Sequence, residues 1–287
     1  MKISLIISFY KRIDFLELVL MSLLQQDYKT FEVIIAEDDN CEETIIFLKE
    51  KAARFSFNIL HVYQRSDSGF RKNEMLNKAI HVATGELIII IDGDCILHKS
   101  FFKEYAKEIE DRKVLFGRRA LLSESMTKDL LRSKKISKLK LLNLIWKKTS
   151  RVEDVIYLPA IPKIFKKERN KGVQGSNMGF LKKDILAING FDEDYIKPTT
   201  GEDDDIEWRF RAGGYQFKSM KHKALQYHLY HKFNYSKTEF EHNQKIMNEK
   251  KKSGNIFCIN GINKYEQNPV TEFIQYKNLL TPAKTKF

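Results

Sequence analysis

Two aspartates separated by one glycine follow the most apolar stretch of the chain. Leu87 to Ile91 are five consecutive aliphatic residues, and Asp92, Gly93 and Asp94 come directly after them. Such a run is typical of a strand that is buried on both faces of a parallel sheet. Ligands of open α/β sheets bind at the carboxyl ends of the strands. Because two neighbouring carboxylates repel each other, we expect a divalent cation, Mg²⁺ or Mn²⁺, to bind between them and phosphate oxygens.

Four consecutive acids, from Glu202 to Asp205, form a second cluster of this kind. They precede a run with helical spacing at 206–211, so they lie at a helix N-terminus, where the helix dipole stabilises negative charge. Four acids exceed what capping needs. A carboxylate that is crowded by others or buried has a raised pKa, so we expect a general base for an attacking hydroxyl here. The alternatives are an over-acidic helix cap, and an acidic turn without a ligand at residues 92–94.

Two histidines, His228 and His231, lie three residues apart further along the chain. An isolated histidine is more often structural than a ligand. A neutral imidazole can complete a metal shell, however, and the sequence already predicts a cation site at Asp92 and Asp94. We therefore predict that one of the two histidines is a metal ligand and favour His228, with His231 as the alternative.

Strand and helix patterns alternate over the first hundred residues and must position these side chains. We predict strands at 2–10, 31–36, 58–64 and 87–91, and helices at 14–24, 44–55 and 74–83. This alternation predicts a doubly wound α/β unit with a parallel sheet. Asp38, at the end of the second strand, then lies at the same edge as Asp92 and Asp94, where an acid commonly binds a nucleotide's base or ribose. The absence of Gly-x-Gly-x-x-Gly after the first strand argues against a dinucleotide-binding dehydrogenase, and a Walker A loop is also absent.

Composition favours a globular protein of the cytoplasm. The chain has 287 residues, of which 43% are hydrophobic and 31% charged, so it can bury a full core. No apolar run approaches the length of a membrane span, and the first residues resemble a strand rather than a signal peptide, so we expect neither. The three cysteines, Cys41, Cys95 and Cys258, have no disulfide or metal-ligand spacing, which suits a reducing compartment.

The net charge of +12 is concentrated in one segment. Residues 123–171 hold 14 Lys and Arg against 5 Asp and Glu, which is +9 of the total. Helical spacing at 123–148 follows a predicted strand at 114–121, so the plainest interpretation is a solvated basic helix with one face on the core. A sharper interpretation is a segment that contacts the membrane surface and helps to reach a lipid-linked acceptor. No recognised nucleic-acid module accompanies the charge, so we expect no nucleic-acid partner.

Seven short motifs occur in a fixed order along the chain. They are Ser8-Phe9-Tyr10, Glu37-Asp38, Asp67-x-Gly69-Phe70-Arg71, Asp92-Gly93-Asp94, Gly175-Ser176-Asn177-Met178, Asn189-Gly190-Phe191-Asp192 and Gly201-Glu202-Asp203-Asp204-Asp205. Their order, over residues 2–120 and 172–232, resembles the family 2 glycosyltransferases of GT-A fold. More narrowly, it resembles the branch that shares the carboxy-terminal motif of β-1,4-galactosyltransferases and bacterial chondroitin polymerases.

The resemblance implies a nucleotide-sugar donor, usually UDP-linked, and Mn²⁺ or Mg²⁺ as cofactor. Asp203 matches the catalytic base, Asp38 the acid that reads the uracil or ribose, and Asp94 the more direct metal ligand. The implied site residues are catalytic Asp203, with Glu202 and Asp204; donor-binding Ser8, Tyr10, Arg12, Glu37, Asp38, Asp67, Arg71, Asp92 and Gly93; acceptor-binding Asn177, Met178 and Gly201; and metal-binding Asp94, Asp92 and His228.

The sequence departs from the family pattern in two places. Glu37 stands where Asp is usual, and Thr199-Thr200 replaces the Trp-Gly pair that often precedes Gly-Glu-Asp. The basic insert at 123–171 aligns with nothing in the family. We expect a GT-A domain at 1–235, with a nucleotide-binding half at 1–100 and an acceptor half at 172–235, and a helical C-terminal extension at 236–287.

The resulting hypothesis is an inverting, metal-dependent transfer of a hexosyl or N-acetylhexosaminyl group. The acceptor is expected to be a cell-surface glycan on a lipid carrier or a lipid A core, as in lipopolysaccharide or capsule synthesis. The enzyme is then expected in the cytoplasm, with the basic insert as the candidate contact with the inner face of the membrane.

Two other functions remain open at this point. One is a nucleotidyltransferase that makes nucleotide-sugars, although Ser8 to Arg12 lacks the Gly-rich loop that it usually needs. The other is a catalytically inactive glycan-binding module, against which the intact Asp92, Asp94 and Asp203 argue.

Overall fold

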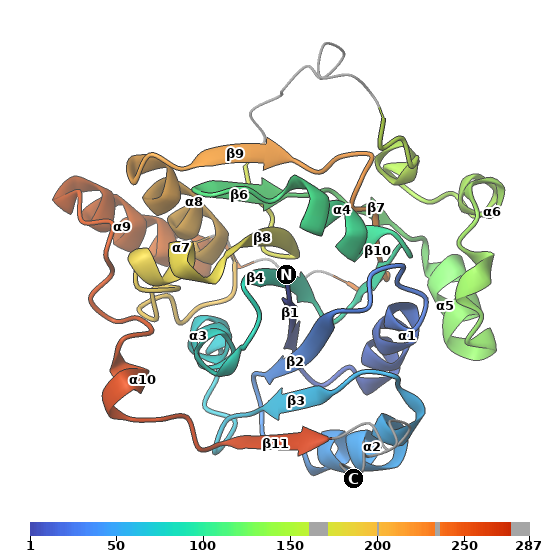
Figure 1. Cartoon of the computed structure of the whole chain (residues 1–287), viewed down its shortest axis with the longest axis horizontal. Coiled ribbons are helices and arrows are strands. Elements are labelled where there is room, and N and C mark those ends of the chain that lie inside the picture. Colours follow the sequence, from blue (N-terminus) through green and yellow to red (C-terminus); the bar gives the residue numbers. More distant parts are fainter. Residues whose placement is uncertain (161–171, 200, 233–235, 277–287) are drawn as a thin grey trace, which may run out of the picture.

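An eight-stranded mixed sheet forms the centre of the computed structural model, which describes residues 1–160, 172–199, 201–232 and 236–276 (Figure 1). The strands β3, β2, β1 and β4 are parallel, and β6 and β9 share their direction, whereas β8 and β11 run the other way. The prediction of a mostly parallel α/β sheet is therefore confirmed. In spatial order the strands are β11 (Phe273–Tyr276), β3 (Ile59–Val62), β2 (Phe31–Glu37), β1 (Ile3–Phe9), β4 (Leu87–Asp92), β8 (Asn177–Leu181), β6 (Lys113–Phe116) and β9 (Gln216–Ser219).

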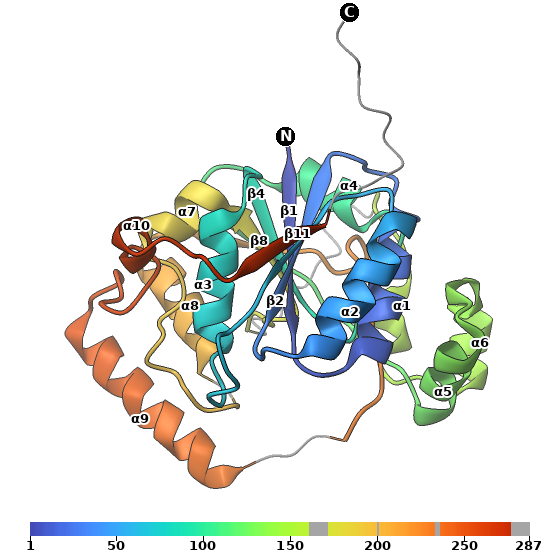
Figure 2. The same ribbon diagram turned by 90° about the horizontal axis from the view of Figure 1, so that it is seen from below.

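Helices cover both faces of this sheet, and alternate residues of the central strands pack against them. Leu87, Ile89 and Ile91 of β4 belong to the core cluster on the α1 face, whereas Ile88 and Ile90 belong to the cluster on the α3 face. Figure 2 shows the sheet between α1 and α2 on one side and α3, α7 and α8 on the other. Burial on both faces explains the uninterrupted aliphatic run. The helices are α1 (Ile13–Leu23), α2 (Glu42–Lys51), which continues into the 3₁₀ turn η1 (Ala52–Arg54), α3 (Lys72–Val82), α4 (Phe101–Glu108), α7 (Lys182–Ala187) and α8 (Glu202–Ala212).

A small second sheet lies beside the carboxyl end of β4. Its order is β5 (Cys95–Leu97), β10 (Gln226–His228) and β7 (Ala120–Leu121). The single strand predicted at 114–121 is wrong, because the chain leaves the large sheet after β6 and enters the small one at β7. Gly117 lies at this break, and a Cβ there would be 2.1 Å from the side-chain amide of Asn177, so only glycine fits.

The basic insert is also less regular than predicted. The helical spacing at 123–148 corresponds to α5 (Glu124–Ser133), the 3₁₀ turn η2 (Ile136–Lys138) and α6 (Leu141–Trp146), followed by η3 (Val152–Val155). Lys134 ends α5 in the left-handed region, with φ of 53°. α5 and α6 protrude from one edge of the molecule (Figures 1 and 2). Residues 161–171 of the predicted insert lie outside the described part of the chain.

The C-terminal extension contains the predicted helical structure and one strand that was not predicted. After α9 (Lys237–Ser253) and α10 (Lys264–Gln267), β11 pairs antiparallel with β3 and becomes the edge of the large sheet. Tyr276 of β11 is 8% exposed and joins the core cluster on the α1 face. Across the described residues, we find no helix that combines the length and apolar character needed to cross a bilayer.

Candidate active site

The turn after β4 places two carboxylates beside the end of β1. The main-chain N–H of Gly93 donates to the carbonyl of Ser8 at 2.8 Å. A Cβ on Gly93 would be 3.2 Å from that oxygen and 3.1 Å from the ring of Phe9. The glycine therefore lets the turn close against β1, with Asp92 on one side of it and Asp94 on the other.

Asp94 lies against both histidines. Its Oδ2 is 3.2 Å from Nε2 of His228 and 3.0 Å from Nε2 of His231. The register of the small sheet brings them together, because β10 pairs His228 with Cys95, and the N–H of Leu229 donates to the carbonyl of Asp94 at 2.9 Å. Burial alone would raise the pKa of Asp94, but hydrogen bonds from the two histidines hold it well below its usual range. The same contact raises the pKa of His231.

This cluster has the chemistry of a divalent metal site. Ligand atoms of Asp94, His228 and His231 all lie within 4.8 Å of one another. A carboxylate with two imidazoles fits Mn²⁺ better than Mg²⁺, which prefers oxygen ligands alone. Asp92, Asp94 and Cys95 form a second close group, in which burial raises the pKa of the Cys95 thiol well above its usual value. A thiol is a soft ligand and suits Mn²⁺ or Mg²⁺ less well than carboxylate oxygens do.

Asp92 is held by two cations that the sequence analysis did not single out. Lys72 Nζ is 3.3 Å from its Oδ1, and Arg119 Nη1 is 3.3 Å from its Oδ2. Lys72 is the first residue of α3, and Arg119 lies in the segment between β6 and β7. The sequence marks Lys72 only by its position directly after Arg71, the last residue of the motif that begins at Asp67. Arg119 was missed because it falls within the single strand predicted at 114–121, where the structure has a break between β6 and β7.

Glu37, the last residue of β2, and its neighbour Asp38 have different surroundings. Asp38 accepts a hydrogen bond from the N–H of Arg71 at 2.8 Å and another from Gln64, and burial raises the pKa of its carboxyl. Glu37 is fully buried, with its carboxylate 2.6 Å from the hydroxyl of Thr44 and 2.7 Å from Nε2 of His61. The structure thus brings Asp38 to the edge of the sheet and places Glu37 in the interior.

The loop after β1 forms an exposed rim beside Asp38. Tyr10 is 50% exposed and donates to Asp67 at 3.3 Å, and Lys11 contacts the same carboxylate at 2.8 Å. Arg12 makes two hydrogen bonds of 2.9 Å to Asp14 on the surface. Ser8 ends up between the ends of β2 and β4, paired with Ala36 and Asp92.

Asp203 has the features of a general base. Its Oδ2 accepts the N–H of Gly175 at 2.7 Å, and its Oδ1 is buried without a hydrogen-bond partner among the described residues. Burial raises the pKa of its carboxyl, and the negative charge of Asp92 adds to this, while Lys72 opposes it. A Cβ on residue 175 would be 2.1 Å from Oδ1, so the glycine is needed for this contact.

The remaining acids of the cluster differ from Asp203. Burial raises the pKa of Asp204 as well. Asp205 is 1% exposed and bonds Arg209 at 2.7 Å, the indole of Trp208 at 3.1 Å and the hydroxyl of Tyr195 at 3.1 Å, so its contacts are structural. The side chain of Glu202 lies outside the described part of the structure.

Two of the residues predicted to bind the acceptor have buried side chains. Asn177 accepts the hydroxyl of Tyr105 at 2.6 Å, and Met178 is 1% exposed within the core. Gly201 precedes α8 with φ of 154°, and a Cβ there would be 2.9 Å from the ring of Tyr195. The side chains of Asn177 and Met178 are therefore buried in this structure, at 0% and 1% exposed, although Asn177 pairs with Ile91 directly before Asp92.

Comparison with known proteins identifies the family. The sequence model described as "Glycosyl transferase family 2" matches residues 4–155, more than half of the chain. The chain belongs to this family. A second model, described as "N-terminal domain of galactosyltransferase", matches residues 157–232 of this family 2 glycosyltransferase. Together they confirm the resemblance seen in the order of the motifs.

Curated relatives of the family 2 glycosyltransferase match over part of its length. The Bacillus subtilis protein EpsE, whose name describes it as a candidate glycosyltransferase, is 30% identical over 108 residues, 38% of this chain and 37% of EpsE. The B. subtilis protein CgeD is 24% identical over 115 residues, 39% of this chain and 27% of CgeD. The chain thus covers well under half of either relative.

Solved structures confirm the GT-A fold of the family 2 glycosyltransferase. S. aureus TarS 1-349 in complex with UDP has a TM-score of 0.56 and 16% identity, over 86% of this chain and 64% of that one. The mannosyltransferase PcManGT from Pyrobaculum calidifontis, in complex with GDP-Man and Mn²⁺, has a TM-score of 0.55 and 16% identity, over 86% of this chain and 60% of that one. Because both structures are only 16% identical to this chain in sequence, the similarity shows the fold alone.

Proposed function

We propose that this chain is a metal-dependent, inverting glycosyltransferase that moves a sugar from a nucleotide-sugar, UDP-linked, to a hydroxyl of a glycan or glycolipid. One observation supports the proposal most strongly: Lys72 interacts with both acidic motifs, the one that contains Asp92 and the one that contains Asp203. This ammonium is 3.3 Å from Asp92, and its charge lowers the pKa of Asp203, more than a hundred residues away, against the effect of burial. A donor phosphate held near Lys72 would therefore be next to a buried base.

The donor half of the site offers distinct contacts for each part of a nucleotide diphosphate. Asp38 can accept hydrogen bonds from the base or ribose, and the exposed ring of Tyr10 can stack on the base. Lys72 and Arg119 supply positive charge for the diphosphate. Asp94, His228 and His231 would hold the divalent ion. When bound, this ion supplies Lewis-acid stabilisation of the charge on the departing diphosphate.

The donor class is supported by what the structural neighbours bind. TarS has been solved in complex with UDP and with UDP-GlcNAc, and PcManGT with GDP-Man and Mn²⁺. The resemblance in sequence favours a UDP-linked donor for this chain.

Asp203 is proposed to take the proton from the acceptor hydroxyl. Its unpartnered Oδ1 can accept that proton while the hydroxyl oxygen bonds to the anomeric carbon, and the bond from this carbon to the diphosphate oxygen breaks on the opposite face. One displacement inverts the anomeric configuration and needs no covalent nucleophile. Gly175, whose N–H holds Oδ2 at 2.7 Å, fixes the orientation of the base.

Release of UDP from a panel of UDP-sugars, with Mn²⁺ and with chelator, tests this function in the wild type and in Asp94→Ala. We expect Mn²⁺-dependent release that the variant loses, and a transferred sugar whose anomeric configuration, read by NMR, is opposite to that of the donor. Release of pyrophosphate would instead show a nucleotidyltransferase. Binding of a donor or glycan without any turnover would show an inactive binding module.

A further inference from the structure

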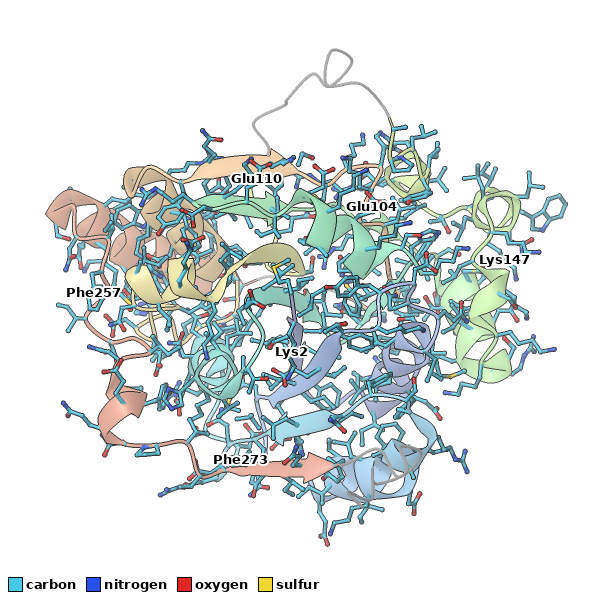
Figure 3. All side chains as sticks on the ribbon, in the orientation of Figure 1. Lys2, Glu104, Glu110, Lys147, Phe257 and Phe273 are labelled. Carbon is cyan, nitrogen blue, oxygen red and sulfur yellow. The ribbon has the colours of Figure 1, made fainter. Side chains whose placement is uncertain are left out.

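The helix α6 exposes nearly all of its apolar side chains. Leu142 is 80% exposed, Trp146 is 85%, Ile145 is 55% and Leu141 is 42%, whereas Leu144 alone in this helix is buried. Apolar side chains scattered singly on a surface are common, but four on one six-residue helix form a patch. The patch lies on the protrusion made by α5 and α6, on which Figure 3 labels Lys147.

Lysines flank this patch on both sides in the sequence. Residues 134–148, which we call the α6 tip, contain six lysines and no acid. Lys134 pairs with Glu17 at 2.7 Å, and Lys138 pairs with Asp129 at 2.6 Å. The other lysines of the tip include Lys135, Lys140 and Lys148, which are exposed and have no ion pair within the described residues. The tip therefore combines apolar side chains with uncompensated positive charge.

We propose that the α6 tip docks on an anionic lipid bilayer. In this arrangement the indole of Trp146 and the side chains of Leu142 and Ile145 enter the boundary between headgroups and acyl chains. Lysines contact the phosphates, with aliphatic stems that can lie along the apolar region. The combination of an aromatic ring, branched aliphatic residues and cations matches the chemistry of this interface.

Other occupants fit the tip less well. A second copy of the tip would bring another six lysines against the first, and like charges repel. A nucleic acid would satisfy the lysines, but its backbone offers nothing to Leu142 or Ile145. The bilayer satisfies both the charge and the apolar surface.

The tip is connected to the candidate active site through α5. The insert begins after β7, which pairs Leu121 with His228 of the metal cluster. Thr127 of α5 accepts the N–H of Tyr230 at 2.8 Å, and Met126 and Leu130 anchor α5 in a buried cluster. Docking would hold the acidic edge near the membrane, where a lipid-linked acceptor would be found. That last link rests on the proposed function, whereas the docking itself does not.

Sedimentation with vesicles tests the docking. The full chain should bind vesicles of phosphatidylcholine mixed equally with phosphatidylglycerol far more tightly than phosphatidylcholine alone. The double variant Leu142→Ser/Trp146→Ser should lose at least about tenfold in affinity, since each change removes a buried apolar side chain. Replacing Lys135, Lys140 and Lys148 by Ser should lose on the order of 100-fold, from about 1 kcal/mol per lysine.

The matched control is Ile259→Ser. Ile259 is 88% exposed but lies in the C-terminal extension, so its loss should leave vesicle binding unchanged. In a Trp208→Phe background Trp146 is the one remaining tryptophan, and its emission should shift to the blue on anionic vesicles. Release of UDP from a soluble donor should be the same in wild type and Leu142→Ser/Trp146→Ser.

Three results would overturn the docking. They are no preference for anionic vesicles, equal binding by the α6 variants and wild type, or a dimer that Leu142→Ser/Trp146→Ser abolishes without any effect on vesicles. The protein could also bind vesicles through α6 and yet transfer no sugar. That result would support the docking and would refute only the proposed function.

Discussion

The carboxylate of Asp94 lies 3.2 Å from Nε2 of His228, which comes from the opposite half of the chain. The contact exists because β10 is inserted between β5 and β7, directly beside the turn that contains Asp94. Burial alone would raise the pKa of this carboxyl, but the hydrogen bonds from the two histidines lower it. The carboxylate and the two imidazoles of the candidate metal site therefore lie together in this structure.

Asp94→Asn is expected to weaken Mn²⁺ binding by at least about 10- to 100-fold and to lower kcat by a comparable or larger factor. The amide keeps the shape of the side chain but removes the charge. Titration of Mn²⁺, followed by EPR or calorimetry, measures the first effect independently of turnover. The control is Asp111→Asn, at an exposed carboxylate that precedes β6 and pairs with Lys183. Unchanged Mn²⁺ affinity in Asp94→Asn would remove Asp94 from the metal site.

Asp203→Asn is expected to lower kcat on the order of 10²- to 10⁴-fold while the Kd for the donor changes little. The change removes the proton acceptor but none of the contacts assigned to the nucleotide. In the wild type, burial raises the pKa of Asp203, and the base works only when ionised. Activity should therefore fall with decreasing pH at values above the ordinary aspartate range of about 3.9. The residual activity of Asp203→Asn provides the check. If it falls with decreasing pH as the wild-type activity does, a group other than Asp203 causes that fall.

Much of this site followed from the sequence because its acids end strands of a parallel sheet. The run Leu87 to Ile91 predicted a buried strand, and its end predicted the position of Asp92 and Asp94. Asp38 followed in the same way, since the carboxyl ends of parallel strands share one edge.

What escaped prediction depends on tertiary contacts. Glu37 was expected beside Asp38, but side chains alternate along β2, and its buried partner His61 lies on the neighbouring strand. Arg119 lies between β6 and β7, after the break at Gly117, where a Cβ would meet the side chain of Asn177. β11 is a short strand whose pairing with β3 joins residues more than two hundred positions apart. Local periodicity contains none of this information.

Lys72→Met and Arg119→Met are each expected to raise the Kd for UDP about 10- to 100-fold, which corresponds to the 1.5–3 kcal/mol typical of a hydrogen bond to a charged group. Both cations border Asp92 at 3.3 Å and would face the donor diphosphate. Calorimetry with UDP, without acceptor, isolates the donor step. Lys72→Arg keeps the charge and should retain most of the affinity. If Lys72→Met bound UDP as the wild type does, Lys72 would serve only to hold Asp92.

Asp205→Ala is expected to destabilise the fold by about 3–5 kcal/mol, because it leaves the guanidinium of Arg209 buried without its charge partner. Arg209 is 1% exposed and 2.7 Å from Asp205. Urea unfolding measures the loss, and protein that remains folded at low temperature should still bind UDP. This outcome would separate Asp205 from Asp203, two residues away in the same acidic motif. A large loss of activity without a loss of stability would contradict the structural role.

Asp203→Asn is expected to raise the free energy of unfolding near neutral pH. Burial raises the pKa of Asp203 in the folded protein, so the folded state binds a proton there more readily than the unfolded chain does. Above both pKa values the carboxylate is ionised in both states, and the folded protein bears the desolvation of the charge. As the pH falls through the folded-state pKa the group takes up a proton and this destabilisation disappears.

The gain in the free energy of unfolding of Asp203→Asn over the wild type should thus be full at neutral pH and shrink on acidification. Thermal or urea unfolding of both proteins over a series of pH values would measure it. Equal stability at every pH would mean that Gly175 and Lys72 fully offset the burial, and Asp203 would then lack the raised basicity that the proposed proton transfer needs.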